Sequence, residues 1–428
     1  MFLNVFVLIC LCVKLSLQLN KNETESLFKW GKNKHINYHP FISINPSSKE
    51  HSFPYFKTDG LISVEDTIIQ IPSTLFISVD NILALTKNKK VRLIYEMISN
   101  HNNEFIKYNS TKEMMFISLI LQQSKYLLNK NCTFYKRFKR YINIYKDSSF
   151  DNFPLLYTED ELKFLRQTNL AVSIETAKMS LNEEIKLIEH EFNLTHFNVD
   201  EYIKYRIFTL ANSILINNIT LLVPFIECFP KSSLAPNAHY EYNPKTNSIE
   251  ISSLHEIFDN EVIVLQHRRL PNAMNLLYYG FTEDKNSLLS SYVIDVINNV
   301  FRREMNLTDY IEKDDLKVYD IAKEAFEDNI INTYRRIAMR HPVYGMNINS
   351  GGYRLMRDNL AYYELIYTNI THGEINKNIY GDRKALDVKR VVDLERELIK
   401  KRMEYLKTKI DDIDNIKQNE TEIINDEL

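Results

Sequence analysis

Glycine is scarce in this chain and unevenly placed, and this limits the folds that the chain can adopt. The 428 residues include 8 glycines, and Gly60 is the only glycine between Gly31 and Gly280. Dinucleotide-binding and P-loop folds need several glycines within a few residues, because their backbone N–H groups must approach a phosphate closely. The sequence therefore excludes both of these nucleotide-binding folds.

The composition is that of a folded protein with nearly balanced charge. Hydrophobic residues make up 44% of the chain and charged residues 25%, which is too apolar for wholesale disorder. The 53 Lys and Arg residues and 56 Asp and Glu residues give a net charge of −3, which argues against a nucleic-acid partner. A chain of this length is expected to form two or three domains.

Both ends of the sequence indicate the secretory pathway. Residues Phe2 to Val13 form an apolar run that only Asn4 interrupts, which suits a signal peptide and is too short to span a bilayer. Residues 425–428 read Asn-Asp-Glu-Leu, similar to the KDEL-type retrieval signal. We therefore expect residues 1–19 to be a removed signal peptide, and the mature chain to reside in the lumen of the endoplasmic reticulum without membrane attachment. A membrane anchor or a buried N-terminal segment is the alternative for the apolar run.

Cysteines and glycosylation motifs are compatible with that location. Cys132 and Cys228 follow the expected signal peptide and allow at most one intrachain disulfide. Acceptor motifs for N-glycosylation, which make the chain a candidate glycoprotein, occur at Asn22, Asn109, Asn131, Asn193, Asn218, Asn306, Asn369 and Asn419.

Three parts of the sequence predict β-structure. β-branched residues dominate Leu61–Val79, and Ser213–Phe229 and Glu261–Gln266 are also strand-like. Residues 240–251 alternate around an Asn-Pro-Lys-Thr-Asn turn, which predicts a β-hairpin. The β-structure is thus expected in two regions that lie far apart in the sequence.

Helical periodicity fills the regions between and after these strands. The segment from about 111 to 212 predicts a helical insert, and nearly everything beyond residue 286 is also helical in pattern. Ala385–Ile410 has one apolar stripe, which predicts packing against neighbouring helices, with a partner-binding groove as the functional alternative. Residues 20–55 show no periodicity, so we expect a loosely ordered lead-in there.

Four motifs follow one another in an order that points to a known class. Residues 62–72 read ISVEDTIIQIP, 150–162 read FDNFPLLYTEDEL, 222–227 read LVPFIE and 272–281 read NAMNLLYYGF. Together they resemble SET-domain proteins of the Rubisco large-subunit methyltransferase class, which includes the actin-histidine methyltransferase.

The resemblance implies an α+β fold with a SET-like β-core split by a helical insert. The SET-like domain would cover residues 56–283 with its insert at about 111–212. An all-helical domain like the substrate-binding domain of the class would cover residues 284–428. The resemblance also implies a polypeptide substrate or partner that binds through the C-terminal domain.

The resemblance further implies positions that hold S-adenosylmethionine (AdoMet). The class has a G-x-G turn before the first strands and an Asn-His pair after its "LVPMAD" motif. This chain has Phe53, Pro54 and Tyr55 at the turn, and Pro230 and Lys231 at the pair. Proline has no N–H to donate and the aromatic side chains add bulk, so these candidate cofactor-binding positions predict poor binding of AdoMet.

Two more positions of the class are altered. The class has an arginine for the cofactor carboxylate on the helix before "LVP", whereas no arginine occurs from Ile207 to His267. Its catalytic tyrosine falls on His267, while the Tyr of "YGF" is kept as Tyr279. We take His267 and Tyr279 as candidate catalytic residues. A neutral imidazole at position 267 can perform only part of the role of a tyrosine hydroxyl.

Two functions from different classes remain. The first is a lumenal polypeptide-binding protein that does not transfer methyl groups and needs no cofactor. The second is an AdoMet-dependent protein lysine or histidine N-methyltransferase with a rebuilt site, in which His267 and Tyr279 orient the amine. No metal site is predicted, because His190, Glu191 and His196 do not have the spacing of a zinc-binding HExxH motif.

Overall fold

The computed structural model describes most of the chain. The described residues are 22–47, 53–101, 106, 108–128, 132–146, 150–163, 165, 168–284, 286, 293–295, 299–305, 307, 311, 318–320, 328–344, 346, 350–372 and 377–426. The expected signal peptide at 1–19, the last two residues of the Asn-Asp-Glu-Leu sequence, and the glycosylation motifs at Asn131 and Asn306 lie outside the described residues.

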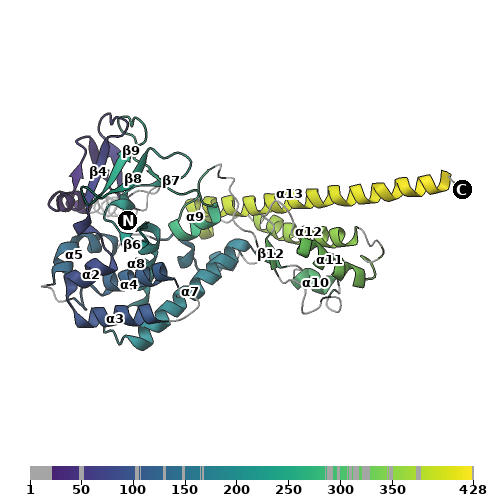
Figure 1. Cartoon of the computed structure of the whole chain (residues 1–428), viewed down its shortest axis with the longest axis horizontal. Coiled ribbons are helices and arrows are strands. Elements are labelled where there is room, and N and C mark those ends of the chain that lie inside the picture. Colours follow the sequence, from purple (N-terminus) through teal and green to yellow (C-terminus); the bar gives the residue numbers. More distant parts are fainter. Residues whose placement is uncertain are drawn as a thin grey trace, which may run out of the picture. The chain divides into compact units, whose positions relative to one another are not determined.

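The chain forms two compact units that are interleaved in the sequence (Figure 1). The first contains Met1–Leu156, Thr176–Arg269 and Tyr278–Gly280. The second contains Tyr157–Glu175, Leu270–Leu277 and Phe281–Leu428. The boundary between the two units therefore cannot be placed at a single position in the sequence.

A six-stranded sheet is the largest one among the described residues, and it organises the first unit. Its order is β1 (Asn37–Tyr38), β4 (Thr67–Pro72), β9 (Ser248–Ser253), β8 (Ala238–Asn243), β10 (Leu265–Gln266) and β7 (Lys231–Ser232). The predicted hairpin is confirmed, because β8 and β9 pair antiparallel with Tyr240 opposite Ile251 and Tyr242 opposite Ile249. The two distant β-regions also join as expected, since β4 pairs with β9.

Two smaller sheets also lie among the described residues of the first unit. β2 (Ile42–Asn45) pairs antiparallel with β3 (Tyr55–Thr58), and β5 (Ser213–Ile216) with β6 (Ile219–Leu222). Short 3₁₀ helices lie at η1 (Ser73–Leu75), η3 (Pro154–Leu156) and η4 (Ile226–Cys228). The Ser213–Phe229 region is thus a tight hairpin followed by η4.

The helices of the insert begin earlier in the chain than the sequence suggested. They are α2 (Val79–Thr86), α3 (Lys89–Asn100), α4 (Asn109–Gln123), α5 (Thr133–Lys146), α7 (Asn169–Glu191) and α8 (Val199–Asn212). Ser78 caps α2 by accepting a hydrogen bond from the N–H of Asn81, and Asn88 caps α3 in the same way from Lys90. These capping residues are a sequence signal for the helices between residues 79 and 100, which the expected insert at about 111–212 does not include.

The expectation of a loosely ordered lead-in at 20–55 was wrong for its described part. Residues 22–32 are helical, and the side chains of Leu27 and Trp30 are buried in the core. The Trp30 indole N–H donates to the carbonyl of Arg137 in α5 at 3.1 Å, and its ring stacks on Tyr141. Long-range burial of single aromatic residues orders this segment, and such contacts leave no periodic signal in the sequence.

The second unit is mainly helical. It includes α6 (Glu159–Lys163), α10 (Asn299–Glu304), α11 (Asp328–Arg340), α12 (Gly351–His372), α13 (Lys377–Asp426) and the strand pair β11 (Val293–Asp295) and β12 (Val318–Asp320). α9 (Asn272–Tyr279) runs from this unit into the first. Among the described residues, no helix is both long and apolar enough to cross a membrane.

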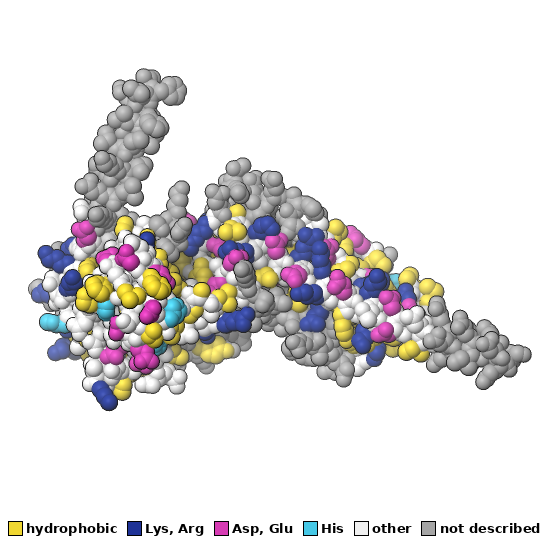
Figure 2. Space-filling model, turned by 90° about the horizontal axis from the view of Figure 1, so that it is seen from above, with side chains coloured by type: hydrophobic (Ala, Val, Ile, Leu, Met, Phe, Trp, Pro, Cys, Tyr) yellow, Lys and Arg dark blue, Asp and Glu magenta, His cyan; other side chains and the backbone are white. Residues whose placement is uncertain are grey.

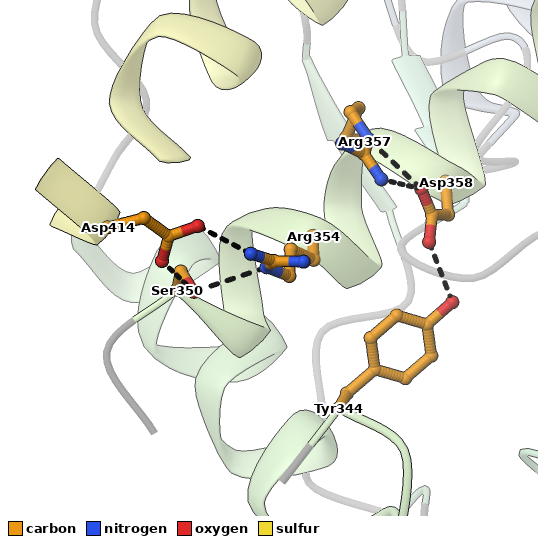
Figure 3. A network of polar contacts seen from close by, with 6 residues as sticks. All are labelled: Tyr344, Ser350, Arg354, Arg357, Asp358 and Asp414. Carbon is orange, nitrogen blue, oxygen red and sulfur yellow. Dashed lines mark hydrogen bonds and ion pairs between the residues drawn. The ribbon is translucent and has the colours of Figure 1, made fainter. Parts of the chain in front are cut away.

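Polar contacts hold α12 antiparallel to α13. Near the start of α12, Arg354 and Ser350 both bind the carboxylate of Asp414 (Figure 3). Further along α12, the Tyr367 hydroxyl donates to the buried carboxylate of Glu395. The apolar stripe predicted for Ala385–Ile410 faces neighbouring helices here, because Leu398, Leu406 and Ile410 are buried. In Figure 1 the end of α13 extends past α12.

We expect Gly31→Ala to destabilise the first unit. A Cβ atom at Gly31 would lie 2.0 Å from the Tyr38 hydroxyl oxygen and 2.9 Å from the Phe225 ring. Overpacking of this kind costs about 1–3 kcal/mol, which exceeds the gain of at most about 1 kcal/mol that alanine brings to a helix. Urea unfolding of both proteins measures the loss.

Gly60→Ala is the matched control for this substitution. The Cβ atom there would meet only the ring of Phe41, at 3.0 Å, and that side chain is 46% exposed and free to turn. If Gly31→Ala were no less stable than Gly60→Ala, the docking of the N-terminal helix against Tyr38 and Phe225 would be wrong.

Candidate functional site

The two candidate catalytic residues lie in contact. His267 directly follows β10 and Tyr279 ends α9, and their ring centroids are 4.4 Å apart at an interplanar angle of 75°. Burial raises the pKa of the Tyr279 hydroxyl above its ordinary value, while the nearby Arg268 opposes this shift. Tyr279 is therefore a neutral phenol at physiological pH.

Parallel pairing of β7 with β10 places Lys231 next to His267 and Tyr279. The backbone N–H of Leu265 donates to the carbonyl of Pro230 at 2.8 Å, and that of His267 donates to the carbonyl of Ser232 at 2.9 Å. The register sets Lys231 opposite Leu265. One candidate cofactor position is thus brought next to both candidate catalytic residues.

The Lys231 ammonium is turned inward and surrounded by groups that attract a cation. Its Nζ atom donates to the carbonyl of Ala211 and, at 3.2 Å, to the side-chain oxygen of Asn212, both at the C-terminus of α8. The same atom lies over the Tyr279 ring, 5.3 Å from the centroid. A helix C-terminus and an aromatic face are both favourable sites for a positive charge.

Burial of this ammonium has a measurable consequence. Loss of hydration lowers the pKa of Lys231 from 10.5 to about 8, and the nearby Glu227 carboxylate partly offsets the shift. A pKa of about 8 still leaves roughly ten charged molecules for each neutral one at pH 7. The side chain is therefore a cation under physiological conditions, held at some cost in hydration.

The candidate turn at Phe53, Pro54 and Tyr55 is filled with aromatic side chains. The Phe53 ring makes edge contacts at 5.8 Å with Phe208 in α8 and with Phe150. Pro54 is buried, and Tyr55 begins β3 with its ring 5.9 Å from the Nζ atom of Lys57. Where the resemblance implies an open glycine backbone, this chain packs a ring against its core.

The same aromatic cluster extends to the residue after Tyr279. Phe150 lies 6.0 Å from Phe153, and a Cβ atom placed on Gly280 would meet the Phe153 ring at 2.9 Å. Gly280 also has a φ of +72°, and its carbonyl accepts a hydrogen bond from the Asn152 side chain. A glycine is required here for both reasons. Contacts thus run from Phe53 through Phe150 and Phe153 to Gly280, the residue after Tyr279.

The arginine nearest to the expected position on α8 is engaged elsewhere. Arg206 makes a bidentate pair with Glu184 of α7, with Nε–Oε2 and Nη2–Oε1 distances of 2.9 Å. The Tyr202 hydroxyl donates to the same carboxylate at 2.8 Å. All three side chains are buried. Sequence reasoning missed this trio, because Glu184 is one of several acids in α7 and its sequence neighbours do not mark it as buried.

Glu227, within the LVPFIE motif, is a second buried carboxylate that sequence reasoning did not single out. It accepts hydrogen bonds from the Tyr141 hydroxyl and from the backbone N–H of Phe225, each at 3.2 Å. Burial, and then the charge of Glu227, raise the pKa of Tyr141 well above its ordinary value. An acid between Ile226 and Cys228 was visible in the sequence, but the groups that donate hydrogen bonds to it were not.

No group of three or more His, Cys, Asp or Glu side chains that could hold a metal ion is present within the described part of the chain. His190, Glu191 and His196 lie at the end of α7 and in the loop that follows it. The site at Lys231, His267 and Tyr279 consists of a cation, an imidazole and a phenol.

Comparison with solved structures identifies the fold. The structure of Rubisco LSMT bound to AdoMet matches with a TM-score of 0.63 and 13% identity, covering 92% of this chain and 93% of that one. The LSMT SET domain bound to lysine and AdoHcy matches with a TM-score of 0.62 and 14% identity, covering 90% and 92%. This chain has the fold of a Rubisco LSMT-type SET protein. No protein-family model and no curated protein matches the sequence.

The comparison confirms the fold class that the sequence predicted. A further Rubisco LSMT structure, bound to sinefungin and monomethyllysine, matches with a TM-score of 0.60 and 14% identity over 90% of this chain and 92% of that one. The matches span both units, so the LSMT-type fold includes the split β-core, the helical insert and the helical C-terminal region.

We expect the wild type to gain stability relative to a Lys231→Met variant as the pH rises from 8 to 10.5. Between pH 8 and 10.5 the unfolded chain keeps the lysine proton that the folded chain has lost, so stability rises with pH. Relative to Lys231→Met, the free energy of unfolding of the wild type should rise by up to about 3 kcal/mol over this range. Urea unfolding at several pH values measures it.

The comparison with Lys231→Met removes contributions from groups that both proteins share. Glu227, His267, Arg268 and Tyr279 face this region in both proteins. Lys245→Met, in the exposed turn between β8 and β9, is the matched control. A stability difference between wild type and Lys231→Met that stayed constant from pH 8 to 10.5 would show that burial does not lower the pKa of Lys231 in the folded protein.

Proposed function

We propose that this chain is a SET-like protein that binds a polypeptide in the lumen of the endoplasmic reticulum and does not transfer methyl groups. The observation that carries the proposal is the inward position of the Lys231 ammonium against Ala211, Asn212 and Tyr279. Because the ammonium of Lys231 already occupies these contacts, a cationic cofactor is not expected to bind at the same place.

The residues at the expected cofactor positions do not fit AdoMet. The carboxylate of the cofactor needs a cation or several N–H donors once it leaves water. Pro54 has no N–H, Arg206 is paired with Glu184, and the ammonium of Lys231 points to Ala211 and Asn212. The rings of Phe53 and Phe150 take the place of an open turn.

One observation favours the alternative, an AdoMet-dependent protein lysine or histidine N-methyltransferase. The rings of His267 and Tyr279 touch, and together they could orient an amine by hydrogen bonding. Similar solved structures hold AdoMet or AdoHcy. The two functions differ in whether this chain binds the cofactor at all.

The second unit supports a polypeptide partner by its surface. Met339, Val343 and Met346 follow one another at the end of α11 and in the segment after it, with exposed fractions of 55%, 58% and 82%. Flexible, exposed methionines adapt to varied apolar side chains. In Figure 2, Lys and Arg side chains are interspersed with acidic and hydrophobic ones on the visible face of this unit. Such a mixed surface suits a peptide better than an oligonucleotide.

We expect S-adenosylhomocysteine to bind the purified chain weakly or not at all. Each lost charge-assisted contact should cost roughly 1.5–3 kcal/mol, so two losses weaken affinity by about two to four orders of magnitude. Isothermal titration calorimetry, with Rubisco LSMT as the positive control, measures the dissociation constant. A low-micromolar value would overturn the proposal, and His267→Ala should then abolish methyl transfer if the alternative is right.

The proposed location rests on the apolar run at the N-terminus and on the Asn-Asp-Glu-Leu sequence at 425–428. We expect the intact chain, carrying an internal epitope in the turn at 244–246, to show a reticular lumenal pattern by microscopy. Deleting residues 425–428 should release it into the medium. Cytosolic staining of both forms would contradict the location without affecting the fold.

A further inference from the structure

Two turns of the first unit are closed by the same set of hydrogen bonds. In the first turn, the backbone N–H of Ser63 donates to the Asp66 carboxylate at 3.0 Å. In the second, the backbone N–H of Phe258 donates to the Glu261 carboxylate at 2.9 Å. In both turns the backbone N–H of the acid donates back to the carbonyl of the first residue, at 3.2 and 3.1 Å. Each turn is therefore held by its backbone and by a side chain.

The segments that lead into these turns lie side by side and are paired. Ile62 and Ile257 exchange both of their backbone hydrogen bonds at 3.0 Å, and both side chains are fully buried. In an antiparallel pair, the neighbours of two inward-facing residues point to the opposite face. This pairing sets Leu61 opposite Phe258 on the outer face, where their side chains are 50% and 61% exposed.

Phe41 extends this outward-facing apolar pair. Its carbonyl accepts a hydrogen bond from the backbone N–H of Asp59 at 2.7 Å, and its exposed ring lies close against Gly60, the residue before Leu61. A third segment thus adds an aromatic ring to the same surface. We call the exposed apolar side chains on these segments the turn patch, which consists of Phe41, Leu61, Val64, Leu254 and Phe258.

The charge around the turn patch is acidic. Residues 37–45, 53–70 and 248–266 contain one lysine and no arginine, and the Nζ atom of that lysine, Lys57, lies over the Tyr55 ring. The exposed acids on the same segments are Asp59, Glu65, Glu256 and Asp259. Figure 2 shows hydrophobic side chains gathered on the visible face of the first unit, with acidic and histidine side chains among them. The complementary partner carries apolar side chains and positive charge.

We propose that the turn patch binds a polypeptide segment in which large apolar side chains are flanked by lysine or arginine. A second copy bound through the same surface would set acids against acids, and nucleic acid or anionic lipid would also be repelled. Because both turns are already closed, little conformational entropy is lost on binding. The inference goes beyond the proposed function, since it holds whether or not the chain binds AdoMet.

Fluorescence anisotropy of the full chain with three labelled heptapeptides tests the proposal. Lys-Lys-Phe-Ala-Phe-Lys-Lys has both features, Glu-Glu-Phe-Ala-Phe-Glu-Glu reverses the charge, and Lys-Lys-Ser-Ala-Ser-Lys-Lys lacks the apolar side chains. We expect the first peptide to bind saturably, less tightly at high salt, and about tenfold or more tighter than the other two. No saturable binding of the first peptide, or equal binding of either other peptide, would overturn the proposal.

The double variant Leu61→Ser with Phe258→Ser removes the centre of the turn patch. It should weaken binding of the first peptide by about tenfold or more. Leu93→Ser, at a similarly exposed leucine on α3, is the matched control and should leave the affinity unchanged. All three side chains are exposed, so urea unfolding should give stabilities close to that of the wild type. If the double variant bound the peptide as the wild type does, the turn patch would not be the site.

A second double variant, Glu256→Gln with Asp259→Asn, changes the charge and keeps the shape. It should weaken binding by roughly twofold to tenfold and reduce the dependence on salt. Glu96→Gln, at an exposed acid on α3, is its matched control. An unchanged affinity and salt dependence in the double variant would contradict a basic partner.

Light scattering distinguishes a peptide partner from a second copy of this chain. We expect the chain to show no self-association that depends on the turn patch. If the wild type associated with itself and the variant Leu61→Ser with Phe258→Ser did not, the occupant would be a second copy and the proposal would be wrong.

Discussion

The parallel pairing of β7 with β10 is the contact on which the site depends. Two backbone hydrogen bonds, from Leu265 to Pro230 and from His267 to Ser232, set the register of two short strands. Because side chains alternate along a strand, a slip of one residue would turn Lys231 away from α8 and from Tyr279. The candidate catalytic and cofactor positions are thus linked by backbone geometry and not by their own attraction.

Aromatic packing fills the region of the candidate turn at residues 53–55. Phe53 lies against Phe208 and Phe150, and Phe153 closes on Gly280 beside Tyr279. The Lys231 ammonium, which lies against Ala211 and Asn212 at the end of α8, loses hydration on burial, and this lowers its pKa to about 8.

Two buried acids show what a pattern of residues in the sequence can and cannot predict. Glu227 stands out as a charged residue in an apolar stretch, whereas Glu184 is one of several acids in α7. Burial of an unpaired carboxylate is so unfavourable that each of these two buried acids needs a partner. The sequence does not say which partner. Arg206, on α8, and Tyr141, on α5, come to these carboxylates only when the helices of the insert pack. The same limit explains why residues 22–32 were expected to be loosely ordered.

The sequence by itself determined the fold class and the hairpin at 240–251. These features depend on local alternation, turn chemistry and motif order, which are all legible along the chain. Only the tertiary structure decided that Lys231 points inward to Ala211 and Asn212, and that Phe53 joins the core. The direction of a long, flexible side chain depends on which neighbours the packed elements place around it, and those neighbours come from distant parts of the sequence.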